Sequence, residues 1–234
     1  MSEVLEILSN GEIEVEGRLV DASNATLLIS VSHQGRVLRA IYKPIAGERP
    51  LWDFPDGNLA SRERAAYLVS QSLGYEQVPL TILRDGPFGQ GMVQQWIDID
   101  ESIDLEDFFR ERNEQLRKVA IFDAVINNTD RKIGHLIPDA EGSLFICDHG
   151  VTFHEDDKLR TVIWQWAGEE LTQQERETLQ NLLSAIESDQ ISELKSLITE
   201  SEISALKYRI ERLVSEGKFP TPNPDWPAIP WPPF

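Results

Sequence analysis

Four charged side chains occur in an order and at a spacing that suit transfer of a phosphoryl group. Lys43 closes the apolar segment Ala40-Ile-Tyr-Lys43, and Glu63 follows 20 residues later in a predicted helix. Asp130 lies in a polar stretch after a second predicted helix, and Asp148 follows a short apolar segment. Phosphoryl transfer requires a protein to hold a polyphosphate, bring in a metal ion and orient a hydroxyl. A lysine fixed by a glutamate, an aspartate facing the nucleophile and an aspartate for the metal would meet these needs.

Each of these residues also has an ordinary structural explanation. A lysine at the end of a strand is usually exposed, and a glutamate in the first turn of a helix stabilises the helix dipole. Asp130 could form a turn, and Asp148-His-Gly150 could be a plain loop. The joint order and spacing of the four residues favour the catalytic interpretation.

The first hundred residues are expected to form a sheet interrupted by one helix. The helix begins at Asn58 or Ser61 and ends at Leu73-Gly74, since glycine is a favoured residue after a helix. Alternating and β-branched apolar residues predict three strands of a meander before the helix and two strands after it. These strands are Ile13–Val20, Thr26–Val31, Val37–Tyr42, Val78–Leu83 and Gly91–Ile97.

The second half of the chain is expected to be mainly helical, with two short strands at His135–Ile137 and Leu144–Cys147. Apolar residues at helical spacing predict the helices Leu105–Phe109, Glu111–Asn127, Thr172–Ser188, Ile191–Thr199 and Ser201–Glu216. The segment Phe219–Phe234 holds 7 of the 13 prolines and therefore excludes a helix or an inner strand. We expect this tail to pack on the domain, because tryptophans such as Trp226 and Trp231 are costly to leave in water.

Composition and charge exclude several function classes. The 234 residues include 22 Lys and Arg and 40 Asp and Glu, so the net charge is 22 − 40 = −18. This charge argues against broad nucleic-acid binding and against docking on anionic lipid. The single cysteine, Cys147, excludes an internal disulfide and a cysteine-based zinc site. No apolar run is long enough to span a bilayer, so we expect a cytoplasmic protein without a transmembrane segment.

The motifs together resemble those of the protein-kinase-like superfamily, most closely a bacterial family related to the phosphatidylinositol 3-/4-kinase catalytic domain. Ala40-Ile-Tyr-Lys43 stands where kinases have V-A-I-K, and Asp148-His149-Gly150 stands for D-F-G. Asp130-Arg131-Lys132 resembles the D-R-H of lipid kinases. The stretches Glu48–Gly57 and Ile229–Phe234 are also typical of the bacterial family, and no role is assigned to either.

The resemblance implies a role for each matched residue. Lys43 would contact the α- and β-phosphates of ATP, and Glu63 would pair with Lys43. Asp130 would orient or deprotonate the acceptor hydroxyl, and Lys132 would neutralise charge on the transferred group. Asp148 would bind the principal Mg²⁺.

Three departures from the kinase pattern leave alternatives open. His135 stands five residues after Asp130, where kinases have a metal-binding asparagine. Imidazole suits Mn²⁺ or Zn²⁺ better than Mg²⁺, so His135 either changes the metal preference or only forms a hydrogen bond. No glycine-rich loop is present, and no A-P-E motif follows Asp148.

Other residues are candidates for nucleotide binding. In place of the glycine-rich loop, the turn that holds Ser23 and Asn24 could offer donors to phosphate, or it could be an ordinary turn. Met92–Trp96, which includes Gln94 and Trp96, would link the lobes and offer backbone groups to the adenine edge.

We therefore expect an α+β, two-lobed protein-kinase-like fold. Residues 1–96 would form an antiparallel sheet lobe, residues 97–218 a mainly helical lobe, and residues 219–234 a tail. The expected activity is ATP-dependent phosphotransfer with Mg²⁺ or Mn²⁺ to an unidentified hydroxyl on a small molecule, lipid headgroup or protein. The alternatives are transfer of AMP on the same fold and a nucleotide-binding pseudokinase or scaffold.

Overall fold

Five strands of the computed structural model, which describes residues 2–19 and 24–234, form one antiparallel sheet in the order β1-β2-β3-β5-β4. The strands are β1 (Glu12–Arg18), β2 (Leu27–His33), β3 (Arg36–Pro44), β4 (Thr81–Gly86) and β5 (Gly89–Gln95). The predicted meander is confirmed, and alternate residues of β2 are buried as its sequence pattern requires. The predicted end of the first strand, at Val20, lies outside the described residues.

A short helix at the N-terminus, α1 (Glu3–Asn10), was not predicted from the sequence. Its hydroxyl cap is Ser2, which accepts a hydrogen bond from the Leu5 amide. Ile7 and Leu8 of α1 pack against the sheet in the smaller of the two apolar cores. Eight residues with one narrow apolar face are too short a signal to identify from periodicity alone.

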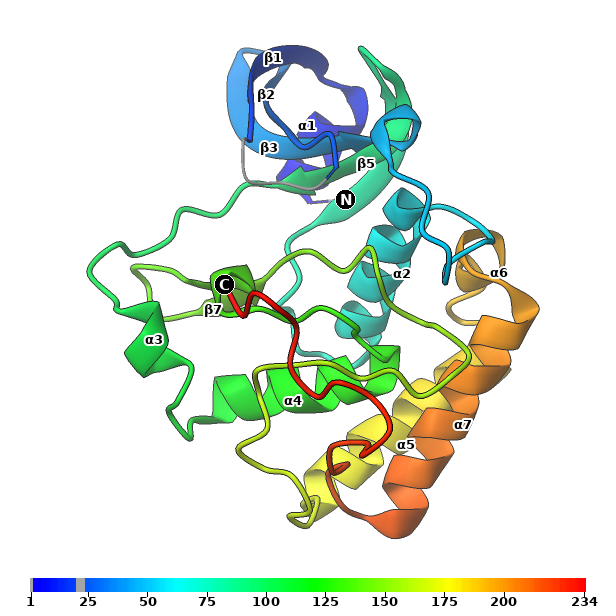
Figure 1. Ribbon diagram of the computed structural model, residues 1–234. Helices are drawn as coiled ribbons and strands as arrows, with labels where there is room; N and C mark the ends of the chain where they lie inside the picture. Colours follow the sequence, from blue (N-terminus) through cyan, green and yellow to red (C-terminus); the bar gives the residue numbers. More distant parts are fainter. Residues whose placement is uncertain (1, 20–23) are drawn as a thin grey trace.

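Helix α2 (Leu59–Ser72) lies between the sheet and the helical lobe (Figure 1). Asn58 caps it by accepting a hydrogen bond from the Ser61 amide, so the first of the two predicted caps is correct. The Glu48 carboxylate accepts hydrogen bonds from the Leu59 and Ala60 amides, at 2.8 Å each. These contacts place a negative charge at the positive end of the helix dipole and fix where α2 begins.

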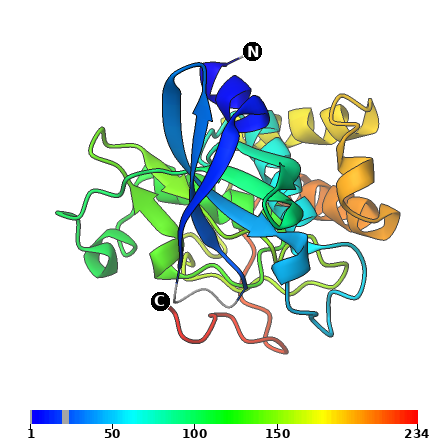
Figure 2. The same cartoon turned by 90° about the horizontal axis from the view of Figure 1, so that it is seen from above.

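The larger lobe is built around α4 (Glu114–Ile126), whose residues are mostly buried. The last helix and the short strand pair pack against α4, and the two helices before the last one pack on it and on α2 (Figures 1 and 2). In chain order, the other elements of this lobe are α3 (Leu105–Phe108), β6 (Leu136–Pro138), β7 (Leu144–Ile146), α5 (Gln173–Glu187), α6 (Leu194–Leu197) and α7 (Glu200–Glu216). Two 3-10 turns, η1 (Ile45–Gly47) and η2 (Ile133–His135), complete the elements. The predicted helices are confirmed, but α6 is shorter than the expected Ile191–Thr199.

The tail crosses the larger lobe and ends beside Ile133, next to β7 in the view of Figure 1. It is held through its backbone carbonyls: Ala228 accepts from the Thr161 amide at 3.0 Å, and Pro233 accepts from the Ile133 amide at 2.8 Å. The prediction that the tail packs on the domain is confirmed, but the expected cause is only half right. Trp226 is half-buried, whereas Trp231 is 85% exposed. Because prolines have no backbone N–H, the tail contacts the domain mainly through its carbonyl groups.

The helices of the described residues are all too short or too polar to cross a bilayer.

Candidate active site

A cavity of about 500 Å³ opens between the sheet and the larger lobe. One wall comes from β3, β5 and the residues after β5, and the other comes from the β6–β7 hairpin and the residues after it. Many of its lining side chains are apolar, and the charged residues Lys43 and Asp148 lie together within hydrogen-bond distance. Its lining includes Leu19, Ile41, Lys43, Trp96, Ile97, Ile99, His135, Ile137, Cys147 and Asp148. This volume is in the range of small-molecule and cofactor sites.

Lys43, Glu63 and Asp148 meet at this charged part of the cavity. The Lys43 ammonium donates to Glu63 Oε1 at 2.7 Å and to Asp148 Oδ1 at 2.9 Å. The Glu63 side chain is 1% exposed, whereas the Asp148 side chain is 51% exposed. The structure therefore brings together three of the residues singled out in the sequence, from β3, α2 and the segment after β7.

The three charges fix each other's ionisation. Burial alone would lower the pKa of Lys43, but Asp148 and Glu63 raise it well above its usual range. Burial alone would raise the pKa of Glu63, but the Lys43 charge holds it below the usual value. The Lys43 charge likewise holds the pKa of Asp148 far below the normal range. At neutral pH the site therefore consists of one cation and two carboxylates.

The backbone of Asp148 is left-handed, with φ = +61°. An aspartate in this region is uncommon, and such strain tends to occur where surrounding structure fixes a functional side chain. The next amide, that of His149, donates to Glu63 Oε2 at 2.9 Å. Glu63 therefore holds Lys43 with one oxygen and the backbone of the Asp148 segment with the other.

A buried network behind these charges reaches the loop after α4. Arg131 pairs with Asp123 of α4, and both side chains are 0% exposed. Arg131 Nη1 donates to the Cys147 carbonyl at 2.8 Å, and Arg131 Nη2 lies 2.8 Å from His149 Nε2. Since a guanidinium has no acceptor, His149 Nε2 must accept and His149 Nδ1 must carry the hydrogen. That Nδ1 lies 3.6 Å from Glu63 Oε2, so the network connects the Arg131 loop to the ion pair.

Sequence reasoning missed Asp123 and the structural role of Arg131. Asp123 sits among apolar residues on the buried face of α4. A charged residue on such a face is rarely left unpaired, and that was the signal available. The sequence could not show that its partner is Arg131, eight positions further along the chain.

Asp130 lies in the chain next to Arg131 of this network and is not among the residues that line the cavity. Its amide donates to Asn128 Oδ1 at 3.0 Å, and Lys132 Nζ lies 3.5 Å from its carboxylate. Burial raises the pKa of Asp130 above the usual value, although Lys132 opposes this. Because α4 ends at Asn127 in the left-handed conformation, with φ = +52°, the chain changes direction sharply just before Asp130.

His135 is oriented as a hydrogen-bond donor toward Asp148. Its Nδ1 accepts from the Lys132 amide at 3.3 Å, so the ring hydrogen is on Nε2, which lies 3.6 Å from Asp148 Oδ2. Burial lowers the pKa of His135 to about 4, so the ring is neutral at pH 7. A nitrogen that binds a metal needs a free lone pair, and Nε2 of His135 carries the hydrogen in this tautomer. Of the two alternatives for His135, the tautomer therefore favours a hydrogen bond over metal binding. Across residues 2–19 and 24–234, no three His, Cys, Asp or Glu side chains form a group that could hold a metal ion.

The residues predicted to contact the nucleotide are only partly available. The Gln94 side chain is buried and donates to Thr81 Oγ1 at 2.8 Å, and the Trp96 amide donates to the Arg39 carbonyl at 3.1 Å. Both residues line the cavity, but these polar groups are already paired. The Asn24 carboxamide oxygen accepts from the Arg49 amide at 2.9 Å, and Asn24 is not among the cavity-lining residues. Ser23 lies outside the described residues.

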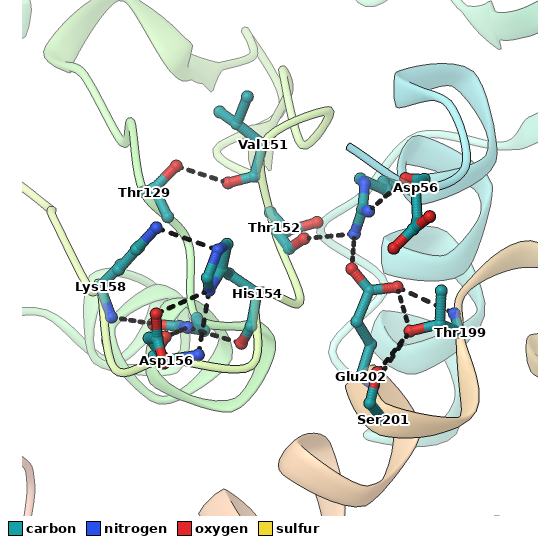
Figure 3. Close-up of polar contacts among 12 residues, drawn as sticks. Asp56, Thr129, Val151, Thr152, His154, Asp156, Lys158, Thr199, Ser201 and Glu202 are labelled. Atoms are coloured by element: carbon teal, nitrogen blue, oxygen red, sulfur yellow. Dashed lines mark hydrogen bonds and ion pairs between the residues drawn. The ribbon is translucent and has the colours of Figure 1, made fainter. Parts of the chain in front are cut away.

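The segment after Asp148 is short and anchored on both sides (Figure 3). The Val151 carbonyl accepts from Thr129 Oγ1 at 2.8 Å, and the Thr152 carbonyl accepts from Arg62 Nη1 at 3.0 Å. The same guanidinium pairs with Glu202 of α7, and this ion pair is nearly fully buried. Arg62 precedes Glu63 on α2, so these contacts fix the helix that carries Glu63 against the larger lobe.

Comparison with known proteins identifies the family. No family model matches the chain. The chain is 40% identical over 263 residues to "Protein Rv2133c" of Mycobacterium tuberculosis (strain ATCC 25618 / H37Rv), a match that covers 97% of this chain and 94% of that protein. The chain belongs to the Rv2133c family.

Solved kinase structures share the fold of this Rv2133c-family chain. A crystal structure of the Golgi casein kinase matches with a TM-score of 0.59 at 14% identity, over 91% of this chain and 73% of that one. The Helicobacter pylori proinflammatory kinase CtkA matches with a TM-score of 0.52 at 13% identity, over 89% of this chain and 94% of that one. The expected two-lobed protein-kinase-like fold is therefore confirmed, while the nearer relation to phosphatidylinositol kinases stays a prediction.

Proposed function

We propose that this Rv2133c-family protein is a metal-dependent kinase that transfers the terminal phosphoryl group of ATP to a hydroxyl acceptor. The observation that carries the proposal is the Lys43 ammonium, held between Glu63 and Asp148 at the charged part of the 500 Å³ cavity. A structural ion pair would not need an exposed second carboxylate at a cavity. In support, one structure of the Golgi casein kinase holds Mn and ADP.

In this proposal the nucleotide lies along the cavity with its phosphates toward Lys43. Ile41 and Ile137 would pack on the two faces of the base. The amides of Ile97 and Ile99 donate to no group of the described residues, so the adenine edge would bind there. The backbone contacts to adenine would thus lie just beyond the expected segment Met92–Trp96, because the Trp96 amide is already hydrogen-bonded.

One carboxylate, that of Asp148, fits a hard divalent cation. Asp148 remains ionised, is half-exposed at the phosphate end and carries oxygen ligands of the kind that Mg²⁺ and Mn²⁺ prefer. Such an ion would supply charge neutralisation for the phosphates. His135 would donate from Nε2 to Asp148 and so hold that carboxylate in place.

Asp130 would act on the acceptor. As the acceptor oxygen forms its bond to the terminal phosphorus of ATP, the bond from that phosphorus to the β–γ bridging oxygen breaks, ADP leaves, and the hydroxyl proton passes to Asp130. The raised pKa of Asp130 makes its carboxylate a better proton acceptor than an ordinary aspartate. Lys132, next to Asp130, would balance charge on the transferred group.

The test is nucleotide binding and turnover of three variants, with Mg²⁺ and Mn²⁺ in turn. ATP with metal should stabilise the wild type by about 2.7 kcal/mol at 100 times Kd, since it binds only the native state. Lys43→Met should lose nucleotide affinity. Asp148→Asn should lose the part of the nucleotide affinity that depends on the metal ion. Asp130→Asn should bind ATP as before and turn over about 10²–10⁴-fold more slowly.

The released product separates the remaining alternatives. Phosphoryl transfer releases ADP, whereas AMP transfer releases pyrophosphate, so the two products are measured in the same reaction. Nucleotide binding without either product would indicate a pseudokinase. An absence of any thermal shift with millimolar ATP and both metals would contradict nucleotide binding altogether.

A further inference from the structure

Arg160 is fixed beside the loop that carries Asp130. Its amide donates to the Asn128 carbonyl at 2.9 Å, and its carbonyl accepts from the Arg131 amide at 3.1 Å. These two contacts bracket Asp130 on both sides in the sequence. The backbone of Arg160 is therefore held at a constant position relative to the proposed catalytic aspartate.

The Arg160 side chain has no protein partner among the described residues. Its Nε is buried without a hydrogen bond, and no described carboxylate lies within 4.0 Å of its guanidinium. Most arginines of the described chain pair with a carboxylate, in a protein with 40 acidic and 22 basic residues. A partly buried guanidinium without a counterion is costly, so Arg160 is the group that best fits an external anion.

Lys132 adds a second cation close to Asp130, since its Nζ lies 3.5 Å from the Asp130 carboxylate. The backbone of Arg160 is hydrogen-bonded to residues on either side of Asp130 in the chain, and both cations oppose the effect of burial on the pKa of Asp130. In an acidic protein, two cations beside the proposed acceptor aspartate create a local positive potential that attracts anions.

The tail occupies two backbone amides next to Arg160 and Lys132 in the chain. Thr161 follows Arg160 and its amide is bound by the Ala228 carbonyl, while Ile133 follows Lys132 and its amide is bound by the Pro233 carbonyl. An extended peptide that added itself along this segment would need such amides. Because the tail already occupies these two amides, a peptide acceptor could not add itself along this segment, and this favours a small molecule.

We propose that Arg160 binds an oxyanion of the acceptor, so that the acceptor is a small alcohol carrying a phosphate or carboxylate group. The inference rests on the proposed kinase function. The planar guanidinium can donate two parallel hydrogen bonds to either oxyanion. This contact would hold the acceptor with its hydroxyl toward Asp130.

The probes are inorganic phosphate and acetate, titrated calorimetrically into the full chain saturated with Mg²⁺ and a non-hydrolysable ATP analogue. The wild type should bind at least one of them saturably, and the one bound identifies the oxyanion class. Arg160→Gln should weaken that binding at least about tenfold, the loss expected for a charged hydrogen bond. Arg160→Lys keeps the charge but cannot donate two parallel hydrogen bonds, so its anion affinity should lie between those of the wild type and Arg160→Gln. Arg176→Gln on α5 removes the same charge far from the cleft and should bind like the wild type.

Three outcomes would overturn the inference. One is that neither anion binds the loaded wild type, and another is that Arg160→Gln binds them equally well. The third is that Arg160→Gln weakens binding of the ATP analogue but not binding of ADP. That result would assign Arg160 to the terminal phosphate of the nucleotide. If the wild type bound no nucleotide, the kinase proposal would fail, and the same titrations on the free protein would still decide whether Arg160 binds an oxyanion.

Discussion

Replacing Glu63 with glutamine tests whether the buried carboxylate organises the site. Glu63 Oε1 accepts from Lys43 and Oε2 accepts from the His149 amide, at 2.7 and 2.9 Å. A glutamine offers one oxygen and one NH₂ group, so one of these two donors must then face another donor. Glu63→Gln thus removes a charge and a hydrogen bond from a side chain that is 1% exposed.

The expected loss of stability depends on the ion pair that Lys43 retains with Asp148. Breaking a buried ion pair by removing one partner costs about 3–5 kcal/mol. Because Lys43 retains Asp148 at 2.9 Å, we expect the lower end, about 3 kcal/mol. At about 2–4 °C per kcal/mol for a chain of this size, the melting temperature should fall by roughly 6–12 °C.

The assay is urea unfolding of Glu63→Gln and wild type, with Glu193→Gln as the matched control. Glu193 pairs with Arg64 at 2.8 Å, but its side chain is 45% exposed, so its loss should cost at most about 1 kcal/mol. The folded-state pKa of Glu63 is lowered from 4.5, so its contribution is present above pH 4.5 and is lost as the pH falls below that value. The difference from wild type should therefore shrink in acid. If Glu63→Gln cost no more than the control at pH 7, the assigned role of the carboxylate would be wrong.

Three further predictions concern the groups around the ion pair. The raised pKa of Asp130 means that turnover should fall on the acid side at a higher pH than an ordinary aspartate would give, and Asp130→Asn should lack this limb in a pH–rate profile. His149→Phe removes the acceptor for Arg131, so urea unfolding should show a loss of about 1–3 kcal/mol, and an unchanged stability would contradict the inferred network. Deleting Pro233–Phe234 frees the Ile133 amide, so kcat should fall in a turnover assay while ATP affinity measured by calorimetry stays as in the full chain.

The sequence by itself determined most of the helices and strands, and it brought Lys43, Glu63 and Asp148 forward as members of one site. Alternating apolar residues set the meander, Asn58 set the start of α2, and the order of Lys43, Glu63 and Asp148 indicated one site. These signals are local or depend only on order along the chain, so they can be read without a fold. The cleft geometry that joins the three residues agrees with that order.

Tertiary structure decided which polar groups remain free to bind. The Trp96 amide is used by Arg39 and the Asn24 side chain by Arg49, partners that are distant in sequence. The hydrogen of His135 is placed on Nε2 because the ring folds back onto the Lys132 amide. Arg160, in contrast, has no carboxylate partner among the described residues, and nothing in the sequence indicates this. Hydrogen-bond pairing is set by three-dimensional proximity and burial, and neither has a signature in residue type or spacing.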